Sequence, residues 1–213
     1  MPPLKALVTP CPNDTFCLLP WLYGKVNTDI DLNVEFADIT DINEYVLSGK
    51  SEYDIVKCSY SQMRNIKTHY TPLHAAAAFS STTGPIIITT PLKQKIATKQ
   101  LRLAIPGFNT TAYTLLKTFC GTYKSIIVLP YEEMLEALHK NTVDCALVIH
   151  ELQFMAEKAG FVIYCNLFDM WKEETALPLP LGGLFLKKNS FNTDKINNII
   201  EDSIEYSYSN KTE

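Results

Sequence analysis

Short apolar runs alternate with amphipathic segments from one end of this chain to the other. The runs are rich in β-branched and other apolar residues, whereas the segments between them repeat their apolar residues at helical spacing. Strands that alternate with helices in this way are typical of α/β proteins. We therefore expect an α/β fold, in which ligands bind beyond the carboxyl ends of the strands.

The pattern runs through the first half of the chain and then restarts. We expect strands at 4–9, 32–37, 54–58, 73–79 and 86–90, and again at 101–105, 126–129, 145–149, 161–164 and 184–186. Between the two halves, 91–100 is polar and lysine-rich, which favours a crossing between two lobes. The last helix is expected to carry an apolar stripe formed by Ile196, Ile199, Ile200 and Ile204.

These observations predict two α/β lobes, of which the first is interrupted by the second. The first lobe would comprise 1–92 plus 185–213, and the second 93–184. A ligand cleft would lie between them.

Length and charge exclude several classes of protein. The chain has 213 residues, of which 46% are hydrophobic and 20% are charged, so it can bury a sizeable core. Its formal net charge of -4 at pH 7 argues against nucleic acid as a partner. The longest stretch without Asp, Glu, Lys or Arg, 68–92, contains two His and three Pro and predicts no membrane span. The apolar run after Lys5 is too short for a signal peptide, so we expect a cytoplasmic protein.

Several common catalytic motifs do not occur in the sequence. The six cysteines include no C-x-x-C pair, so neither a zinc site nor a redox motif is predicted. No G-x-G-x-x-G follows a strand, and G-x-x-x-x-G-K-[ST], G-x-S-x-G and H-E-x-x-H are also missing. Dinucleotide, P-loop nucleotide and metal sites therefore have no support.

Small polar residues gather at four junctions between a predicted strand and the segment that follows it. These junctions are Asn13-Asp14-Thr15, Ser59-Tyr60-Ser61, Thr110-Thr111 and His150-Glu151. Free backbone N–H groups and the helix dipole make such places suitable for an anion. Any one of them can also be a plain helix cap. Four together favour a ligand site.

His150 differs from the other three histidines because it follows five apolar residues at the end of a predicted strand. Partial desolvation would keep its imidazole neutral near pH 7 and able to act as a general base. The alternative is a hydrogen-bonded, partly buried histidine without a catalytic role.

Five segments resemble the 1,4-dihydroxy-6-naphthoate synthase family in order and approximate spacing. They are TPCPNDTF at 9–16, KCSY at 57–60, IPG at 105–107 with TTA at 110–112, VIHE at 148–151 and LPLPLGG at 177–183. The resemblance covers nearly the whole chain. It implies a two-lobed type II periplasmic-binding-protein-like fold and a lyase of the futalosine route to menaquinone. That lyase converts cyclic dehypoxanthine futalosine to 1,4-dihydroxy-6-naphthoate and a small triose-like fragment, without metal or other cofactor.

The resemblance also assigns roles to residues. It implies that His150 is the proton acceptor that starts the cleavage. The substrate, a small-molecule carboxylate, would be bound by Lys57, Cys58, Ser59, Thr110 and Thr111, with Asn13 and Asp14 shaping the site.

Two departures from the family accompany the resemblance. Family members continue through further helices beyond the position of Glu213, so the chain is expected to be short at its C-terminus. The isoleucine stripe would then lack a covering partner, and a homodimer could bury it. Phe108-Asn109 also stands where relatives often carry more polar residues.

Two other functions stay open at this point. One is a non-catalytic small-carboxylate binding protein of the same fold, which would bind its ligand without forming product. The other is the related chorismate dehydratase, which turnover of chorismate derivatives would reveal.

Overall fold

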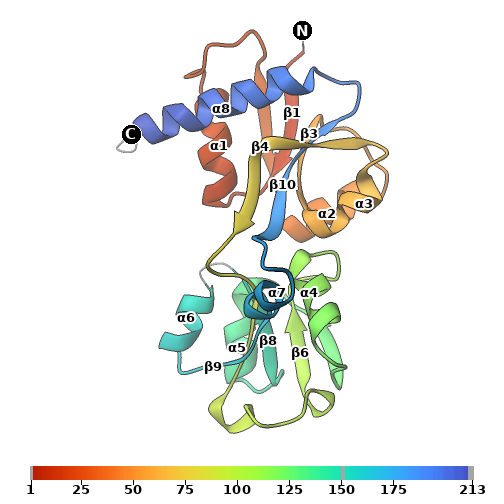
Figure 1. Cartoon of the computed structure of the whole chain (residues 1–213), viewed down its shortest axis with the longest axis vertical. Coiled ribbons are helices and arrows are strands. Elements are labelled where there is room, and N and C mark those ends of the chain that lie inside the picture. The colour runs from red at the N-terminus through yellow and green to blue at the C-terminus, as the bar shows by residue number, and fades with distance from the viewer. Residues whose placement is uncertain (1, 150–151, 211–213) are drawn as a thin grey trace. The chain divides into compact units, whose positions relative to one another are not determined.

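The computed structural model describes residues 2–149 and 152–210, which form two compact α/β units (Figure 1). Unit 1 contains Met1–Ala78 and Gly182–Glu213, and unit 2 contains Phe79–Leu181. The chain leaves unit 1 within strand β4 (Tyr70–Ser80) and returns within strand β10 (Leu179–Lys187). Each unit is built on its own five-stranded sheet.

The sheet of unit 1 has the strand order β2-β1-β3-β10-β4. Strand β1 (Leu4–Val8) pairs in parallel with β2 (Leu32–Phe36) and β3 (Ile55–Ser59), whereas β10 runs antiparallel to β3. The helical segments of this unit are α1 (Pro12–Leu22), α2 (Ile39–Leu47), η1 (Tyr60–Gln62), α3 (Met63–Ile66) and α8 (Thr193–Ser209). Figure 1 shows α1 and α8 together on one side of the sheet and α2 with α3 on the other.

Alternate residues of β1 enter two separate cores, because successive side chains of a strand point to opposite faces. Leu4 and Val8 pack in one core with Trp21 of α1 and with the isoleucines of α8. Leu7 packs in the other core with Ile42 of α2. Both faces of the strand are therefore covered, although Lys5 is exposed.

The sheet of unit 2 has the strand order β7-β6-β8-β5-β9. Strand β6 (Arg102–Ile105) is parallel to β7 (Ser125–Val128) and β8 (Cys145–Val148), and β5 (Ile86–Thr89) is antiparallel to β8 and to β9 (Val162–Asn166). The helical segments are η2 (Pro91–Lys93), η3 (Thr98–Gln100), α4 (Thr111–Phe119), η4 (Tyr131–Glu133), α5 (Met134–His139), α6 (Leu152–Lys158) and α7 (Leu167–Thr175). Again two apolar cores lie on the two faces of the sheet, with Ile86 and Ile88 in one and Ile87 in the other.

The predicted α/β fold is confirmed, since each of the ten expected runs overlaps a strand. Two strands are longer than expected. Strand β4 extends to both sides of its alanine-rich centre, and β10 begins at Leu179, before the two glycines. Helix α7 was not predicted at all.

Three boundaries differ from the prediction. The return to unit 1 lies at Leu181–Gly182 and not at 184–185. The first passage between the units lies at Ala78–Phe79 and not at 91–100, because β5 pairs with β8 and β9 inside unit 2. Helix α1 begins at Pro12, with Cys11 as its N-cap, so Asn13-Asp14-Thr15 form its first turn and do not cap it. Proline suits the first helical position because the N–H it lacks would have no partner there.

The isoleucine stripe of α8 has its cover within unit 1. Ile196 and Ile200 are fully buried and Ile199 is 5% exposed, all in the core shared with β1 and α1. The expected uncovered stripe is therefore wrong, and it gives no reason for a homodimer. The homodimer itself stays a prediction that sedimentation would test. Among the residues that the structure describes, no helix has the length and apolar character of a membrane span.

Candidate functional site

The carboxyl ends of β1 and β3 carry a buried ion pair. Asp14, in the first turn of α1, is 3% exposed, and Lys57 of β3 is 9% exposed. Lys57 Nζ lies 2.5 Å from Asp14 Oδ1. Asp14 Oδ2 accepts hydrogen bonds from the Thr9 hydroxyl at 2.6 Å and from the Thr9 backbone N–H at 3.2 Å. A charge buried in this way is costly unless it is paired and hydrogen-bonded, and here both conditions are met.

The ammonium group of Lys57 keeps donors for a ligand. An ammonium has three N–H groups. Within the described part of the chain, the hydrogen bond of Lys57 Nζ goes to Asp14. Two N–H groups are thus left to bind the oxygen atoms of an anionic ligand.

Cys58 and Ser59 are held by Asn43, a fully buried residue of α2. The Cys58 thiol donates to Asn43 Oδ1, with the sulfur and oxygen 3.3 Å apart. Burial raises the pKa of this thiol to about 12, so it is not a thiolate nucleophile at neutral pH. The Cys58 side chain therefore faces α2, and Ser59 carries the polar group nearest the strand end. Asn43 was not predicted as a site residue. A polar amide beside Ile42 on the apolar face of a helix could have indicated a buried hydrogen-bonding role.

The two glycines of the LPLPLGG segment are required by close packing of β10 against β3. Gly182 pairs with Ser59 and Gly183 with Cys58. A Cβ atom on Gly182 would lie 2.9 Å from the Cys58 carbonyl oxygen, and one on Gly183 would lie 2.7 Å from the Tyr60 hydroxyl. A larger residue at Gly182 would therefore press on the backbone of the strand that carries Lys57 and Ser59, and one at Gly183 would press on the Tyr60 ring.

The remaining site residue predicted in unit 1 lies apart from this group. The Asn13 side chain is exposed, and the backbone carbonyl oxygen of Asn13 accepts a hydrogen bond from the Cys17 thiol. The structure therefore brings Asp14 to Lys57 but leaves the Asn13 side chain outside their hydrogen bonds.

In unit 2, Thr110 and Thr111 lie at the start of α4. Thr110 is the N-cap, as predicted: its hydroxyl accepts from Tyr113 N–H at 3.1 Å and donates to the Gly107 carbonyl at 3.0 Å. The Thr111 hydroxyl donates to the Leu181 carbonyl at 2.7 Å. Both hydroxyl hydrogens are thus used within the protein. The groups of this junction that can bind an anion are the first backbone N–H groups of α4, which lack intrahelical partners.

The predicted base His150 and its neighbour Glu151 lie outside the described residues. The preceding strand β8 is buried along its whole length, as its apolar sequence predicts. Within 2–149 and 152–210, no three His, Cys, Asp or Glu side chains are grouped as metal ligands.

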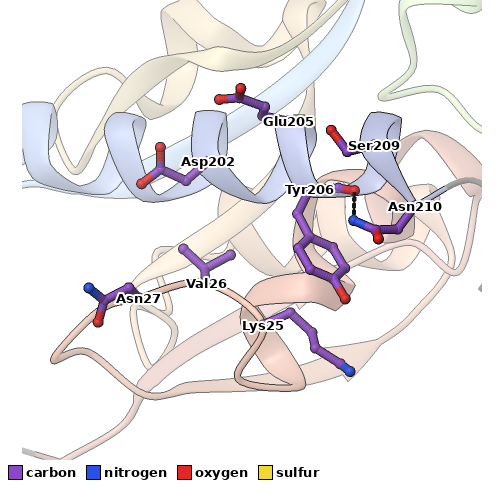
Figure 2. Close-up of a pocket in the computed structure, with 8 residues that line it drawn as sticks. All are labelled: Lys25, Val26, Asn27, Asp202, Glu205, Tyr206, Ser209 and Asn210. Carbon is purple, nitrogen blue, oxygen red and sulfur yellow. Dashed lines mark hydrogen bonds between the residues drawn. The ribbon is translucent and has the colours of Figure 1, made fainter.

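A shallow cavity of about 310 Å³ lies elsewhere on unit 1 (Figure 2). It is formed by the turn after α1 and the C-terminal part of α8, and its lining includes Lys25, Asp202 and Tyr206. Figure 2 shows the Asn210 side chain donating to the Tyr206 carbonyl at its edge. None of the predicted site residues lines this cavity.

Two curated proteins are similar to the chain along most of its length. A 1,4-dihydroxy-6-naphthoate synthase of Thermus thermophilus is 31% identical over 190 residues, which are 89% of this chain and 68% of that protein. A second such synthase, of Streptomyces coelicolor, is 29% identical over 191 residues, 87% of this chain and 66% of that protein. The chain thus spans about two thirds of the length of these relatives.

Solved structures with the same fold include an Archaeoglobus fulgidus protein and a transport protein. The first is 26% identical with a TM-score of 0.89, over 98% of this chain and 78% of that one. The second is an amino acid ABC transporter substrate-binding protein of Streptococcus pneumoniae, 10% identical with a TM-score of 0.62, over 98% of this chain and 89% of that one. The expected periplasmic-binding-protein-like fold is thereby confirmed. Residues 8–213 match the family described as menaquinone biosynthesis, and the chain belongs to that family.

Proposed function

We propose that this protein is a 1,4-dihydroxy-6-naphthoate synthase. It is a carbon–carbon lyase that converts cyclic dehypoxanthine futalosine to 1,4-dihydroxy-6-naphthoate and a small triose-like fragment, in the cytoplasm. The observation that carries the proposal is the similarity to two curated synthases over nearly nine tenths of the chain. The family membership, which concerns menaquinone biosynthesis, supports the same pathway.

His150 is the proposed general base. It removes an acidic proton of the substrate, and the electron pair left behind drives cleavage of the carbon–carbon bond that releases the small fragment. Formation of the aromatic naphthoate ring supplies driving force. The fully buried strand β8 before this residue supports a partly desolvated imidazole, which stays neutral and basic near pH 7.

The proposed binding groups are donors suited to the oxygen atoms of a carboxylate substrate. In unit 1 these are the two remaining N–H groups of Lys57 and the hydroxyl of Ser59, with Asp14 orienting Lys57. Cys58 contributes by packing Ser59 against α2, and Asn13 lies at the exposed edge. In unit 2 the donors are the N–H groups at the start of α4, which Thr110 and Thr111 cap and anchor.

The test compares three proteins on cyclic dehypoxanthine futalosine, with 1,4-dihydroxy-6-naphthoate followed by mass spectrometry. They are the wild type, His150→Ala, and His69→Ala as a matched control at an exposed histidine. Product from the wild type and the control but not from His150→Ala supports both the reaction and the base. Full turnover by His150→Ala would disprove the base, and saturable binding without product in the wild type would favour a non-catalytic binding protein.

A further inference from the structure

We propose that Asn43 is a positioning residue that turns Ser59 into a hydrogen-bond donor for a substrate oxygen. The inference rests on the proposed function, in which Ser59 contacts a carboxylate substrate. It adds a residue to the site and fixes the direction of the hydrogen bond that Ser59 makes.

The backbone of Ser59 fixes the orientation of the Asn43 side chain. Ser59 N–H can only donate, and it lies 3.0 Å from Asn43 Oδ1. The oxygen of the amide must therefore face this N–H group, and the nitrogen must face the other way. The Cys58 thiol donates to the same oxygen, which reinforces the assignment.

The oriented amide then determines what the Ser59 hydroxyl can do. Asn43 Nδ2 lies 2.9 Å from Ser59 Oγ. Because Nδ2 carries only hydrogens, Ser59 Oγ is the acceptor in this contact, and its own hydrogen points elsewhere.

That hydrogen has no acceptor within the described residues, although Ser59 is only 5% exposed. A buried hydroxyl hydrogen without a partner costs free energy, and a ligand oxygen can recover it. Lys57, two residues earlier on the same strand, also keeps N–H groups for an anion. A carboxylate or carbonyl oxygen of a ligand can accept hydrogen bonds from both the Ser59 hydroxyl and the Lys57 ammonium group.

The decisive variant is Asn43→Asp, which has nearly the same shape. The introduced carboxylate still accepts from Ser59 N–H and from Cys58, but it can no longer donate to Ser59 Oγ. The serine hydroxyl would turn and donate to it, and so be lost to the ligand. We expect KM for cyclic dehypoxanthine futalosine and Kd for 1,4-dihydroxy-6-naphthoate to rise about tenfold.

A double-mutant cycle with Ser59→Ala separates this mechanism from repulsion by the new charge. If Asn43 acts through the Ser59 hydroxyl, Asn43→Asp should change Kd less than about twofold in the Ser59→Ala background. An undiminished effect there would overturn the inference. Ser59→Ala alone should also weaken binding, and unchanged binding by that variant would overturn the inference even if Asn43→Asp failed to fold.

Asn197→Asp is the matched control. Asn197 is also an amide of unit 1, 1% exposed, and its oxygen accepts from two backbone N–H groups, those of His74 and Ala75. Its substitution should lower the melting temperature without changing KM or Kd. Binding of the naphthoate is measured by calorimetry and needs no turnover. A wild type that binds but forms no product would therefore refute the synthase proposal, while the cycle still decides the role of Asn43.

Discussion

At the residue scale, the Asp14–Lys57 pair makes the strand ends of unit 1 sensitive to single changes. Asp14→Asn keeps an acceptor for Thr9 but leaves the Lys57 charge buried without its partner. We expect a loss of about 3 kcal/mol in the free energy of unfolding. Urea unfolding followed by circular dichroism measures it.

The matched double variant, Asp14→Asn with Lys57→Met, should recover most of that loss, because no buried charge remains. Asp29→Asn, which breaks the exposed pair with Lys195, should lower the free energy of unfolding only slightly, because exposed ion pairs contribute little to stability. Equal losses at Asp14 and Asp29 would show that burial of the first pair has no energetic consequence.

A second residue-scale prediction concerns acid stability and Asp144 of unit 2. The Arg102 guanidinium, with help from Lys93 and against the effect of burial, holds the pKa of this carboxyl well below its ordinary 3.8. Its stabilising contribution is therefore fully present above that ordinary value and is lost as the pH falls through it toward the lower pKa of the folded state.

Asp144→Asn should accordingly lower stability at pH 7 and flatten the decline of stability between about pH 5 and pH 2. Urea unfolding at several pH values gives both curves. Parallel curves for the two proteins would mean that other carboxyl groups cause the acid sensitivity.

The contacts of Asn43 mark the limit of prediction at this scale. The sequence identified Asp14, Lys57 and Ser59 as candidates, but Asn43 and Ser59 are sixteen positions apart and meet only because α2 packs on β3. A hydrogen bond of this kind depends on tertiary packing, for which local sequence patterns carry no signal.

At the element scale, the two glycines of β10 leave room for its neighbours, Gly182 for the backbone of β3 and Gly183 for the Tyr60 ring of η1. Gly183→Ala would place a Cβ 2.7 Å from the Tyr60 hydroxyl, and we expect a loss of about 1–3 kcal/mol in unfolding free energy. Part of the loss should return in the double variant with Tyr60→Phe, which removes that oxygen. Gly121→Ala is the control, because its Cβ would meet Thr98 Oγ1 at an ordinary 3.6 Å. A Gly183→Ala protein as stable as the control would contradict close packing of β10 against the Tyr60 ring.

The elements that the sequence failed to predict have weak signals for physical reasons. Helix α7 begins with buried Leu167 and Phe168 but soon becomes charged, so its apolar stripe is short. The residue that caps its C-terminus, Ala176, has a φ of 56°, a conformation in which glycine is the usual signal. By contrast, the short strands are mostly apolar, and β5 and β8 are buried along their whole length, so their positions could be predicted closely.

At the scale of the whole molecule, each unit has its own pair of cores, and the chain passes between the units only twice. That the first unit is built from two separate segments of the chain could be predicted, because the pattern of strands and helices restarts near residue 101 and a last strand and helix follow the second unit. The place of the first passage could not be predicted, because it depends on which sheet β5 joins.

Separate cores predict that the units lose stability separately. Ile200→Ala removes a fully buried side chain of unit 1 and should cost about 2–5 kcal/mol there. Hydrogen exchange should then accelerate in β1 and β3 while the amides of β6 and β8 keep their protection. Leu116→Ala, in a core of unit 2, should give the opposite pattern. Equal acceleration in both units from either substitution would show that they unfold as one cooperative body, and that the break in the apolar pattern marks a boundary of topology but not of stability.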